Sequence, residues 1–174
     1  TEFNVEGYPN KLFVDLVKKV RPTQVTLVPD PPGVLTSNAG WDTNENRGLL
    51  KEVLCDFKNE GIRTSVFVST DLKFIEGAKY AGADRVELYT EPYANMYNKN
   101  RQVAIKPFIE ASIFANKLGL GLNAGHDLSL LNLNFFAQNI PDLMEVSIGH
   151  ALISDALYYG LENTVQMYLA RLNE

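Results

Sequence analysis

The spacing of hydrophobic residues switches repeatedly along the chain between the period of a strand and the period of a helix. Short apolar or β-branched runs predict six strands, at 1–7, 24–28, 64–69, 85–89, 120–123 and 144–148. Apolar residues at helical spacing predict helices at 10–20, 48–59, 72–81, 103–117, 131–138, 154–159 and 161–172. Segments 34–46 and 90–100 follow neither period and are predicted to be loops, the first as long as a lid or binding loop.

This alternation of strand and helix predicts an α/β fold, with a parallel sheet and helices outside it. Six units fit either an open doubly wound sheet or part of a (β/α)8 TIM barrel. The barrel is favoured because no Gly-x-Gly-x-x-Gly turn follows a strand, and because polar residues end nearly every strand, where barrels build their sites. These strand-end residues are Glu6, Thr36, Ser69, Thr90, His126 and His150.

The domain organisation follows from the same pattern. No Pro/Ser-rich linker or change in composition divides residues 1–174, so we expect a single domain. In an eight-unit barrel the six units would be strands 3 to 8, the C-terminal three quarters. We therefore expect about two further βα units upstream, since a barrel without them would have open strand edges.

Composition and charge exclude several classes of function. The formal charge of −5 and the scattered distribution of the 16 Lys and Arg residues argue against nucleic-acid binding. No apolar run is long enough to span a membrane. A single cysteine excludes an internal disulfide and suits a reducing compartment. We expect a soluble cytoplasmic protein that binds neither nucleic acid nor membrane.

Both histidines of the chain stand in similar Gly-His turns, each directly after a predicted strand. His126 closes Asn123-Ala-Gly-His126, and it is a candidate general acid or base because histidine is the side chain most often used for proton transfer. His150 closes Ile148-Gly-His150, and a short helix follows, an arrangement with which barrels often hold phosphate. The alternative is two unrelated histidines satisfied by backbone partners.

Strand parity places two carboxylates inside the predicted barrel. One face of the strands carries Asn4 and Glu6, Thr26 and Val28, Glu87 and Tyr89, Asn123, and Ser147. Buried carboxylates are costly unless they are hydrogen-bonded or solvated. Glu6 and Glu87 are therefore either catalytic groups or partners of an Arg or Lys from elsewhere.

Metal and Schiff-base chemistry are both weakly supported. His126, Asp127 and His150 with Glu6 form a conceivable ligand set, but the histidines follow different strands and lack a His-x-x-x-His spacing. No lysine ends a predicted strand, which argues against a Schiff base. We expect no metal and no cofactor.

Several motifs occur in the order and spacing of one known family. They are Asn4-Val-Glu6, Leu27-Val-Pro-Asp30, Leu35-Thr36, Val86-Glu87, Asn123-Ala-Gly-His126 and Ser147-Ile-Gly-His-Ala151. With them the chain resembles the pyridoxine 5′-phosphate synthases, the ring-closing enzymes of vitamin B6 biosynthesis. The pair Asn-Ala-Gly-His and Ile-Gly-His-Ala is specific, whereas Leu-Val-Pro alone is not.

The resemblance implies a (β/α)8 barrel, usually an octamer, with no metal or redox cofactor. It implies condensation of 1-deoxy-D-xylulose 5-phosphate with 3-amino-2-oxopropyl phosphate. The products are pyridoxine 5′-phosphate, inorganic phosphate and water. In the family the amine of one substrate attacks the ketone of the other, which fits the absence of a lysine at the strand ends.

The resemblance also implies a role for each matching residue. Glu6 would be a general base, His126 a proton donor, and Glu87 a stabiliser of transition-state charge. The substrate-binding residues would be Thr36 in the loop, Asp127, and the phosphate-binding pair Gly149 and His150.

Two departures from the family pattern matter. The family commonly has glycine where this chain has Asp127, a change that is tolerable unless the position requires a positive φ. The family's first two strands also carry a further catalytic histidine and several phosphate-binding arginines, which do not occur in these 174 residues. The chain by itself is therefore expected to be catalytically incomplete.

Two other functions remain open from the residues alone. One is a different sugar-phosphate TIM-barrel enzyme, of the aldolase or epimerase type, although such enzymes often use a strand-borne lysine or a metal. The other is a non-catalytic α/β domain that binds a phosphorylated ligand. Such a domain would keep the Gly-His turns without needing a buried Glu6.

Overall fold

Six parallel strands form a single sheet in sequential order, β1 to β6. The structure, a computed structural model, describes residues 2–31, 33 and 39–173. The strands are β1 (Asn4–Gly7), β2 (Gln24–Leu27), β3 (Arg63–Val68), β4 (Arg85–Tyr89), β5 (Gly121–Gly125) and β6 (Leu143–Ser147). The helices are α1 (Lys11–Val20), α2 (Arg47–Asn59), α3 (Leu72–Ala81), α4 (Glu91–Lys117), α5 (Leu133–Asn139), α6 (His150–Tyr159) and α7 (Leu161–Asn173).

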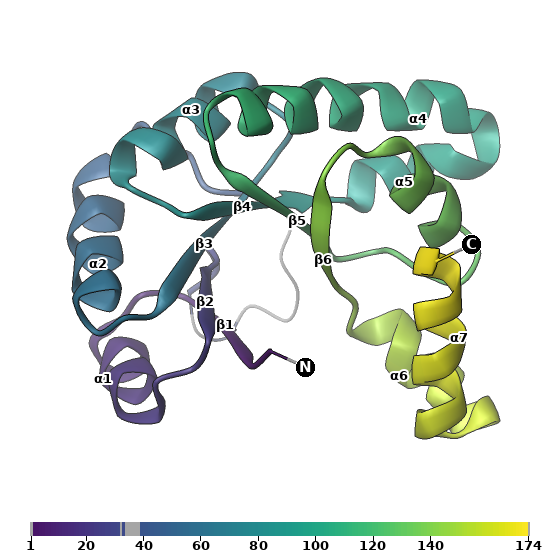
Figure 1. Cartoon of the computed structure of the whole chain (residues 1–174), viewed down its shortest axis with the longest axis horizontal. Helices are drawn as coiled ribbons and strands as arrows, with labels where there is room; N and C mark the ends of the chain where they lie inside the picture. Colours follow the sequence, from purple (N-terminus) through teal and green to yellow (C-terminus); the bar gives the residue numbers. More distant parts are fainter. Residues whose placement is uncertain (1, 32, 34–38, 174) are drawn as a thin grey trace.

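The sheet curls, and the helices α1 to α4 follow its outer side (Figure 1). Every neighbouring pair of strands is parallel, as six consecutive units of a (β/α)8 barrel require. The strands β1 and β6 lie at the two edges of this curled sheet. The predicted α/β class and partial barrel are therefore confirmed.

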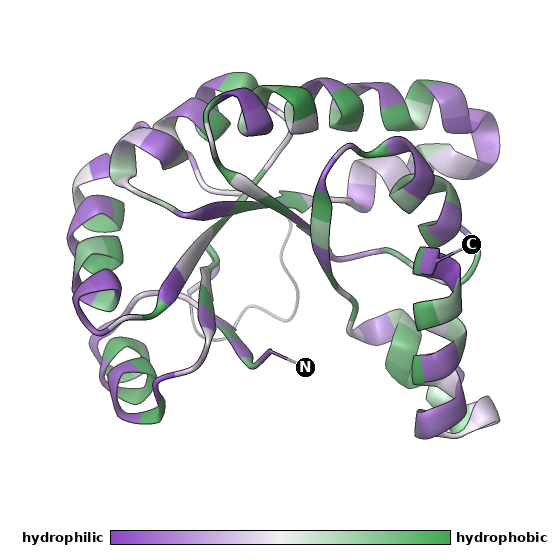
Figure 2. Ribbon diagram, in the orientation of Figure 1, coloured by the Kyte–Doolittle hydropathy of each residue, from purple (hydrophilic) through white to green (hydrophobic). Residues whose placement is uncertain are grey.

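The two faces of the sheet differ in polarity, as parity predicted. Residues that point outward, such as Val25, Val66 and Leu88, are fully buried against helices, which contribute Leu50 and Ile75 among others. Figure 2 shows hydrophobic and hydrophilic positions side by side along the strands. Burial of the outward apolar side chains, at about 25 cal/mol per Å² of apolar surface, holds the helices on the sheet.

The register of the strands brings the inward polar residues together. Glu6 pairs with Thr26 on the neighbouring strand, and Glu87 pairs with Asn123. Gly125, the last residue of β5, pairs with Ser147, the last residue of β6. Residues at similar heights in neighbouring strands therefore form polar layers inside the curl.

The predicted loop 90–100 is wrong, because the structure continues as helix α4 from Glu91. Local sequence misleads here because proline and several asparagines lower helix propensity. Tyr93 overrides that preference, since it is fully buried, donates a hydrogen bond to the Asn132 carbonyl at 2.7 Å and packs against Phe136. Asn100 leaves helical geometry, and its side chain caps the second part of the helix.

Helix α6 begins at His150, four residues before the predicted start at 154. Gly149 is its N-cap residue and makes no side-chain capping hydrogen bond. A helix start without a Ser, Thr or Asp cap is hard to recognise from the sequence. The second Gly-His turn is therefore itself the N-terminus of a helix.

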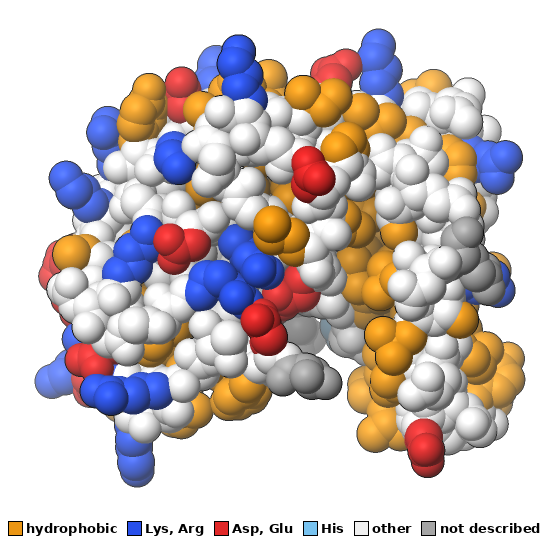
Figure 3. All heavy atoms as spheres, in the orientation of Figure 1, with side chains coloured by type: hydrophobic (Ala, Val, Ile, Leu, Met, Phe, Trp, Pro, Cys, Tyr) orange, Lys and Arg blue, Asp and Glu red, His pale blue; other side chains and the backbone are white. Residues whose placement is uncertain are grey.

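The surface over α6 and α7 is rich in exposed apolar side chains. Figure 3 shows hydrophobic residues gathered over these two helices. The exposed residues are Ile153, Leu157, Tyr158 and Tyr159 on α6, and Leu161, Val165, Met167, Leu169 and Leu172 on α7. Among the described helices, none is long and apolar enough to cross a membrane.

Candidate active site

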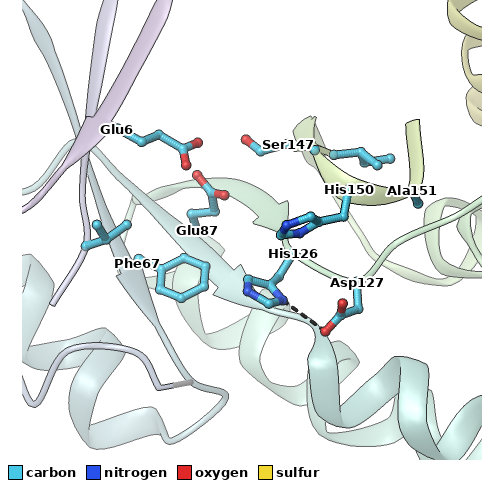
Figure 4. Close-up of a pocket in the computed structure, with 11 residues that line it drawn as sticks. Glu6, Phe67, Glu87, His126, Asp127, Ser147, His150 and Ala151 are labelled. Carbon is cyan, nitrogen blue, oxygen red and sulfur yellow. Dashed lines mark hydrogen bonds and ion pairs between the residues drawn. The ribbon is translucent and has the colours of Figure 1, made fainter. Parts of the chain in front are cut away.

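A cavity of about 400 Å³ opens at the carboxyl ends of the strands, inside the curl (Figure 4). It is lined by Glu6, Val28, Phe67, Glu87, His126, Asp127, Ser147, Ile148, Gly149, His150 and Ala151. Six of the seven site residues expected from the sequence therefore meet in one place. The seventh, Thr36, lies outside the described residues.

Glu87 is buried in the wall of this cavity, with 1% of its surface exposed. The Thr26 hydroxyl donates to its Oε2 atom at 3.3 Å. In the described part of the chain no Arg or Lys forms an ion pair with Glu87, and Arg85 pairs with Glu145 at 3.2 Å instead. Among the described residues, Glu87 is therefore not the ion-pair partner of an Arg or Lys, which was the alternative to a catalytic role.

Glu6 lies on the edge strand β1, with its carboxyl group turned toward Glu87 and Ser147 (Figure 4). The Asn4 side-chain amide donates to its Oε1 atom at 3.2 Å. The residue as a whole is exposed, because its strand forms one edge of the sheet, but the carboxyl group is enclosed by protein.

The environment raises the pKa of both carboxyl groups, and of Glu87 more strongly. Burial is the main reason that the pKa of Glu87 lies well above its usual range, and the negative charges of Glu6 and Glu145 add to it. Burial also raises the pKa of Glu6, while Ser147 and His126 oppose the rise. Because the two carboxyl groups are coupled, they titrate as a pair, and the pair keeps a proton to a higher pH than ordinary glutamates would.

Gly125 makes room for the Glu87 carboxyl group. A Cβ atom at this position would overlap Glu87 Oε1, and it would lie 3.1 Å from Glu87 Cδ and 3.3 Å from Ser147 Cβ. The backbone φ of Gly125 is not positive, so the requirement is steric and not conformational. The sequence alone did not reveal that Gly125 leaves space for a side chain from the neighbouring strand.

His126 has a strained backbone and a tightly packed ring. Its φ is +93°, unusual for a residue other than glycine, and such strain often marks functional positions. The ring packs edge-on against Tyr89, with centroids 5.0 Å apart, and lies 6.5 Å from the Phe67 ring. Its Nδ1 atom lies 2.9 Å from Asp127 Oδ2.

The residue of this turn with a positive φ is His126, and the φ of Asp127 is not positive. An aspartate in place of the family's usual glycine therefore brings no backbone strain. The side chain is partly exposed and reaches back to His126 (Figure 4).

Gly149 and His150 line the same cavity, at the point where helix α6 begins. The first N–H groups of a helix have no partner within it and favour anions. A Cβ atom at Gly149 would meet nothing within 4 Å, so the backbone is open to an approaching group. Both Gly-His turns line the same cavity, which disfavours two unrelated histidines.

Sequence reasoning missed roles for Phe67, Ser147 and Thr26. All three point into the curl, and alternation along their strands was the only available signal. What they do depends on neighbouring strands: Phe67 packs near His126, while Ser147 and Thr26 hydrogen-bond to the carboxyl groups. Over the described ranges, no group of three or more His, Cys, Asp and Glu residues is arranged to hold a metal ion.

A family model described as "Pyridoxal phosphate biosynthesis protein PdxJ" matches residues 1–174. The chain belongs to the PdxJ family. A pyridoxine 5′-phosphate synthase from Bacteroides thetaiotaomicron is 66% identical over 168 residues, which cover 97% of this chain and 71% of the relative. A protein of the same name from Cytophaga hutchinsonii is 59% identical over 174 residues, 100% of this chain and 73% of the relative.

Solved structures with low sequence identity share the fold of this PdxJ-family chain. A citrate synthase variant, SbnG, has a TM-score of 0.63 at 12% identity, with 99% of this chain and 72% of that chain covered. A putative deoxyribose-phosphate aldolase from Toxoplasma gondii has a TM-score of 0.55 at 13% identity, with 99% and 68% covered. At this identity the likeness shows the fold alone.

Proposed function

We propose that this chain carries the active site of a pyridoxine 5′-phosphate synthase. The reaction would condense 1-deoxy-D-xylulose 5-phosphate with 3-amino-2-oxopropyl phosphate, and close the ring to pyridoxine 5′-phosphate with release of phosphate and water. The observation that carries the proposal is the meeting of Glu6, Glu87 and His126 with the Gly149–His150 turn in one cavity. Membership of the PdxJ family supports the choice of reaction.

The electrostatics of the two carboxyl groups support different roles for them. Glu87 is the more deeply buried group, and the raised pKa of Glu6 makes the Glu6 carboxylate a stronger base than an ordinary glutamate. We assign it the removal of substrate protons. Glu87 has no cationic partner among the residues that the structure describes, so positive charge developing on the substrate would supply one.

The remaining cavity residues would donate a proton and hold phosphate. His126 lies at the cavity wall, where its ring nitrogens are within reach of a bound substrate, and we assign it proton donation to a leaving oxygen. The N-terminus of α6 at Gly149 and His150, with Asp127 in the same cavity, would bind one substrate. Thr36 is proposed to contact substrate on the family resemblance alone.

Product formation by wild type and Glu6→Gln tests the proposal. The assay is run on this chain alone and on the chain joined to the upstream segment that the resemblance implies. We expect turnover in the joined form, little in the chain alone, and a loss of about 10²-fold or more in Glu6→Gln with substrate binding retained. Absence of product in both forms overturns the proposal, and unchanged turnover in Glu6→Gln overturns the role of Glu6.

The alternative functions predict other outcomes of this assay. A Schiff-base aldolase needs a lysine in the cavity, and the residues that line it include none. A binding module would retain phosphorylated ligands in wild type and in Glu6→Gln, and would form no product.

We also propose that the partners are the two phosphorylated substrates and copies of the same chain, in the cytoplasm. The apolar residues exposed on α6 and α7 support self-association. Light scattering of the purified protein gives the assembly directly, and a monomer at micromolar concentration would contradict an octamer.

A further inference from the structure

The side chain of Asp127 contacts His126, its neighbour in the turn that follows strand β5. Its Oδ2 atom lies 2.9 Å from His126 Nδ1. At that separation a proton must lie between the two atoms, because the lone pairs of a neutral ring nitrogen and of a carboxylate oxygen repel each other. The contact therefore distinguishes the two neutral forms of the imidazole, and only the form with the proton on Nδ1 satisfies it.

The turn after β5 holds both partners in place. The Leu128 N–H donates to the His126 carbonyl at 2.8 Å, and the Asn132 side-chain amide donates to the Asp127 carbonyl at 3.2 Å. The Asn132 side chain also accepts from the Ser129 N–H at 2.8 Å. Asp127 is thus fixed through its backbone while its carboxylate reaches back to the ring.

Aromatic residues limit the movement of the ring from the other side. Tyr89 meets it edge-on at 82°, and only 19% of the His126 side chain is exposed. In Figure 4 the second ring nitrogen lies on the side of the ring away from Asp127. The titratable groups around the ring are Asp127, Glu6, Glu87 and His150, which line the same cavity, and the Tyr89 phenol.

We propose that Asp127 is a positioning residue that sets the tautomer of His126, with the proton on Nδ1 and Nε2 directed at the substrate. This inference rests on the proposed function, in which His126 donates a proton to the substrate, because it says which ring nitrogen makes the donation. In the charged ring Nε2–H donates, and in the neutral ring Nε2 accepts the proton back.

Nitrogen spectroscopy of the imidazoles tests the tautomer without any turnover. The chain has two histidines, so a long-range ¹H–¹⁵N correlation spectrum of the labelled protein shows four ring nitrogens, and His150→Gln assigns them. At a pH where His126 is neutral we expect Nδ1 protonated and Nε2 unprotonated in wild type. In Asp127→Ala the tautomer ratio should invert, whereas Asp127→Glu keeps an acceptor-only carboxylate and should retain the wild-type form.

Each outcome of this experiment decides the question. Wild-type His126 with its proton on Nε2, or the same tautomer in wild type and Asp127→Ala, overturns the proposal. If Asp127→Ala does not fold, wild type and Asp127→Glu still decide it, since both carry an acceptor-only carboxylate and must show a protonated Nδ1. The spectra require no substrate, so they hold or fail independently of the synthase assignment.

Steady-state kinetics give a second test, in whichever form of the protein catalyses product formation. Asp127→Ala should lower kcat by about tenfold, less than the roughly 10²–10⁴-fold loss expected when a general acid is removed, because the ring itself remains. Asp127→Glu, which keeps an acceptor-only carboxylate, should recover most of that loss. A change confined to KM would indicate that Asp127 only binds substrate.

Discussion

Gly125→Ala is the sharpest structural perturbation of the site, because it adds one methyl group against a buried carboxyl. The new Cβ would overlap Glu87 Oε1 and lie 3.1 Å from Glu87 Cδ, whereas carbon atoms pack best at about 3.5–4.0 Å. The carboxyl group must therefore retreat by at least about 0.4 Å. Thr26 holds its other oxygen at 3.3 Å, so the retreat weakens that hydrogen bond.

The magnitude follows from three contributions. Overpacking of a buried site costs about 1–3 kcal/mol, and a weakened hydrogen bond adds about 0.5–1.5 kcal/mol. Replacing a glycine within a strand returns about 0.5–1 kcal/mol. We expect Gly125→Ala to lower the free energy of unfolding by about 1–3 kcal/mol, or about 2–4 °C in Tm for each kcal/mol.

Urea unfolding followed by circular dichroism measures this loss against a matched control. Gly48→Ala adds the same methyl group in helix α2, where it would meet nothing within 4 Å, and should be neutral or stabilising. In a Glu87→Ala background the overlap is gone, so Gly125→Ala should cost less than in wild type. The steric argument is refuted if Gly125→Ala matches Gly48→Ala, or costs the same in both backgrounds.

Two further predictions concern stability. The raised pKa of Glu87 means that its stabilising contribution is complete below the pKa of an unfolded glutamate and is lost as pH rises through the folded value, with a slope of up to about 1.4 kcal/mol per pH unit. Glu87→Gln should remove most of that slope and be more stable than wild type on the alkaline side. Urea midpoints of wild type and Glu87→Gln that change in parallel across a pH series would contradict this. Trp41 donates to the Leu27 carbonyl at 2.9 Å, so Trp41→Phe should lower the free energy of unfolding by about 1–3 kcal/mol, and a change under about 0.5 kcal/mol would show that this bond matters little.

Much of the fold was predictable because each strand has an apolar outer face that alternates with a polar inner one. That same alternation located Glu6 and Glu87 inside the curl, and the strand ends located His126 and His150. These inferences need only period-two geometry, which is local, and the alternation of strands with helices, which predicts the parallel arrangement.

Features that depend on distant neighbours escaped prediction. The first half of α4 is helical because Tyr93 packs against Phe136, a residue far along the chain that local propensity does not include. The role of Gly125 depends on a side chain from the adjacent strand. The contact between Asp127 and His126 joins sequence neighbours, in a turn where His126 has a positive φ that the sequence does not reveal.

The central claim is that Glu6 is the catalytic base and that its surroundings raise its pKa. The most direct test is the pH dependence of kcat/KM for pyridoxine 5′-phosphate formation, with wild type and Glu6→Gln compared in a form that turns over. We predict an acid limb in wild type above the pH range of an ordinary glutamate, because the pKa of Glu6 is raised. A wild-type rate that stays flat through that range, or an acid limb that persists unchanged in Glu6→Gln, would contradict the account.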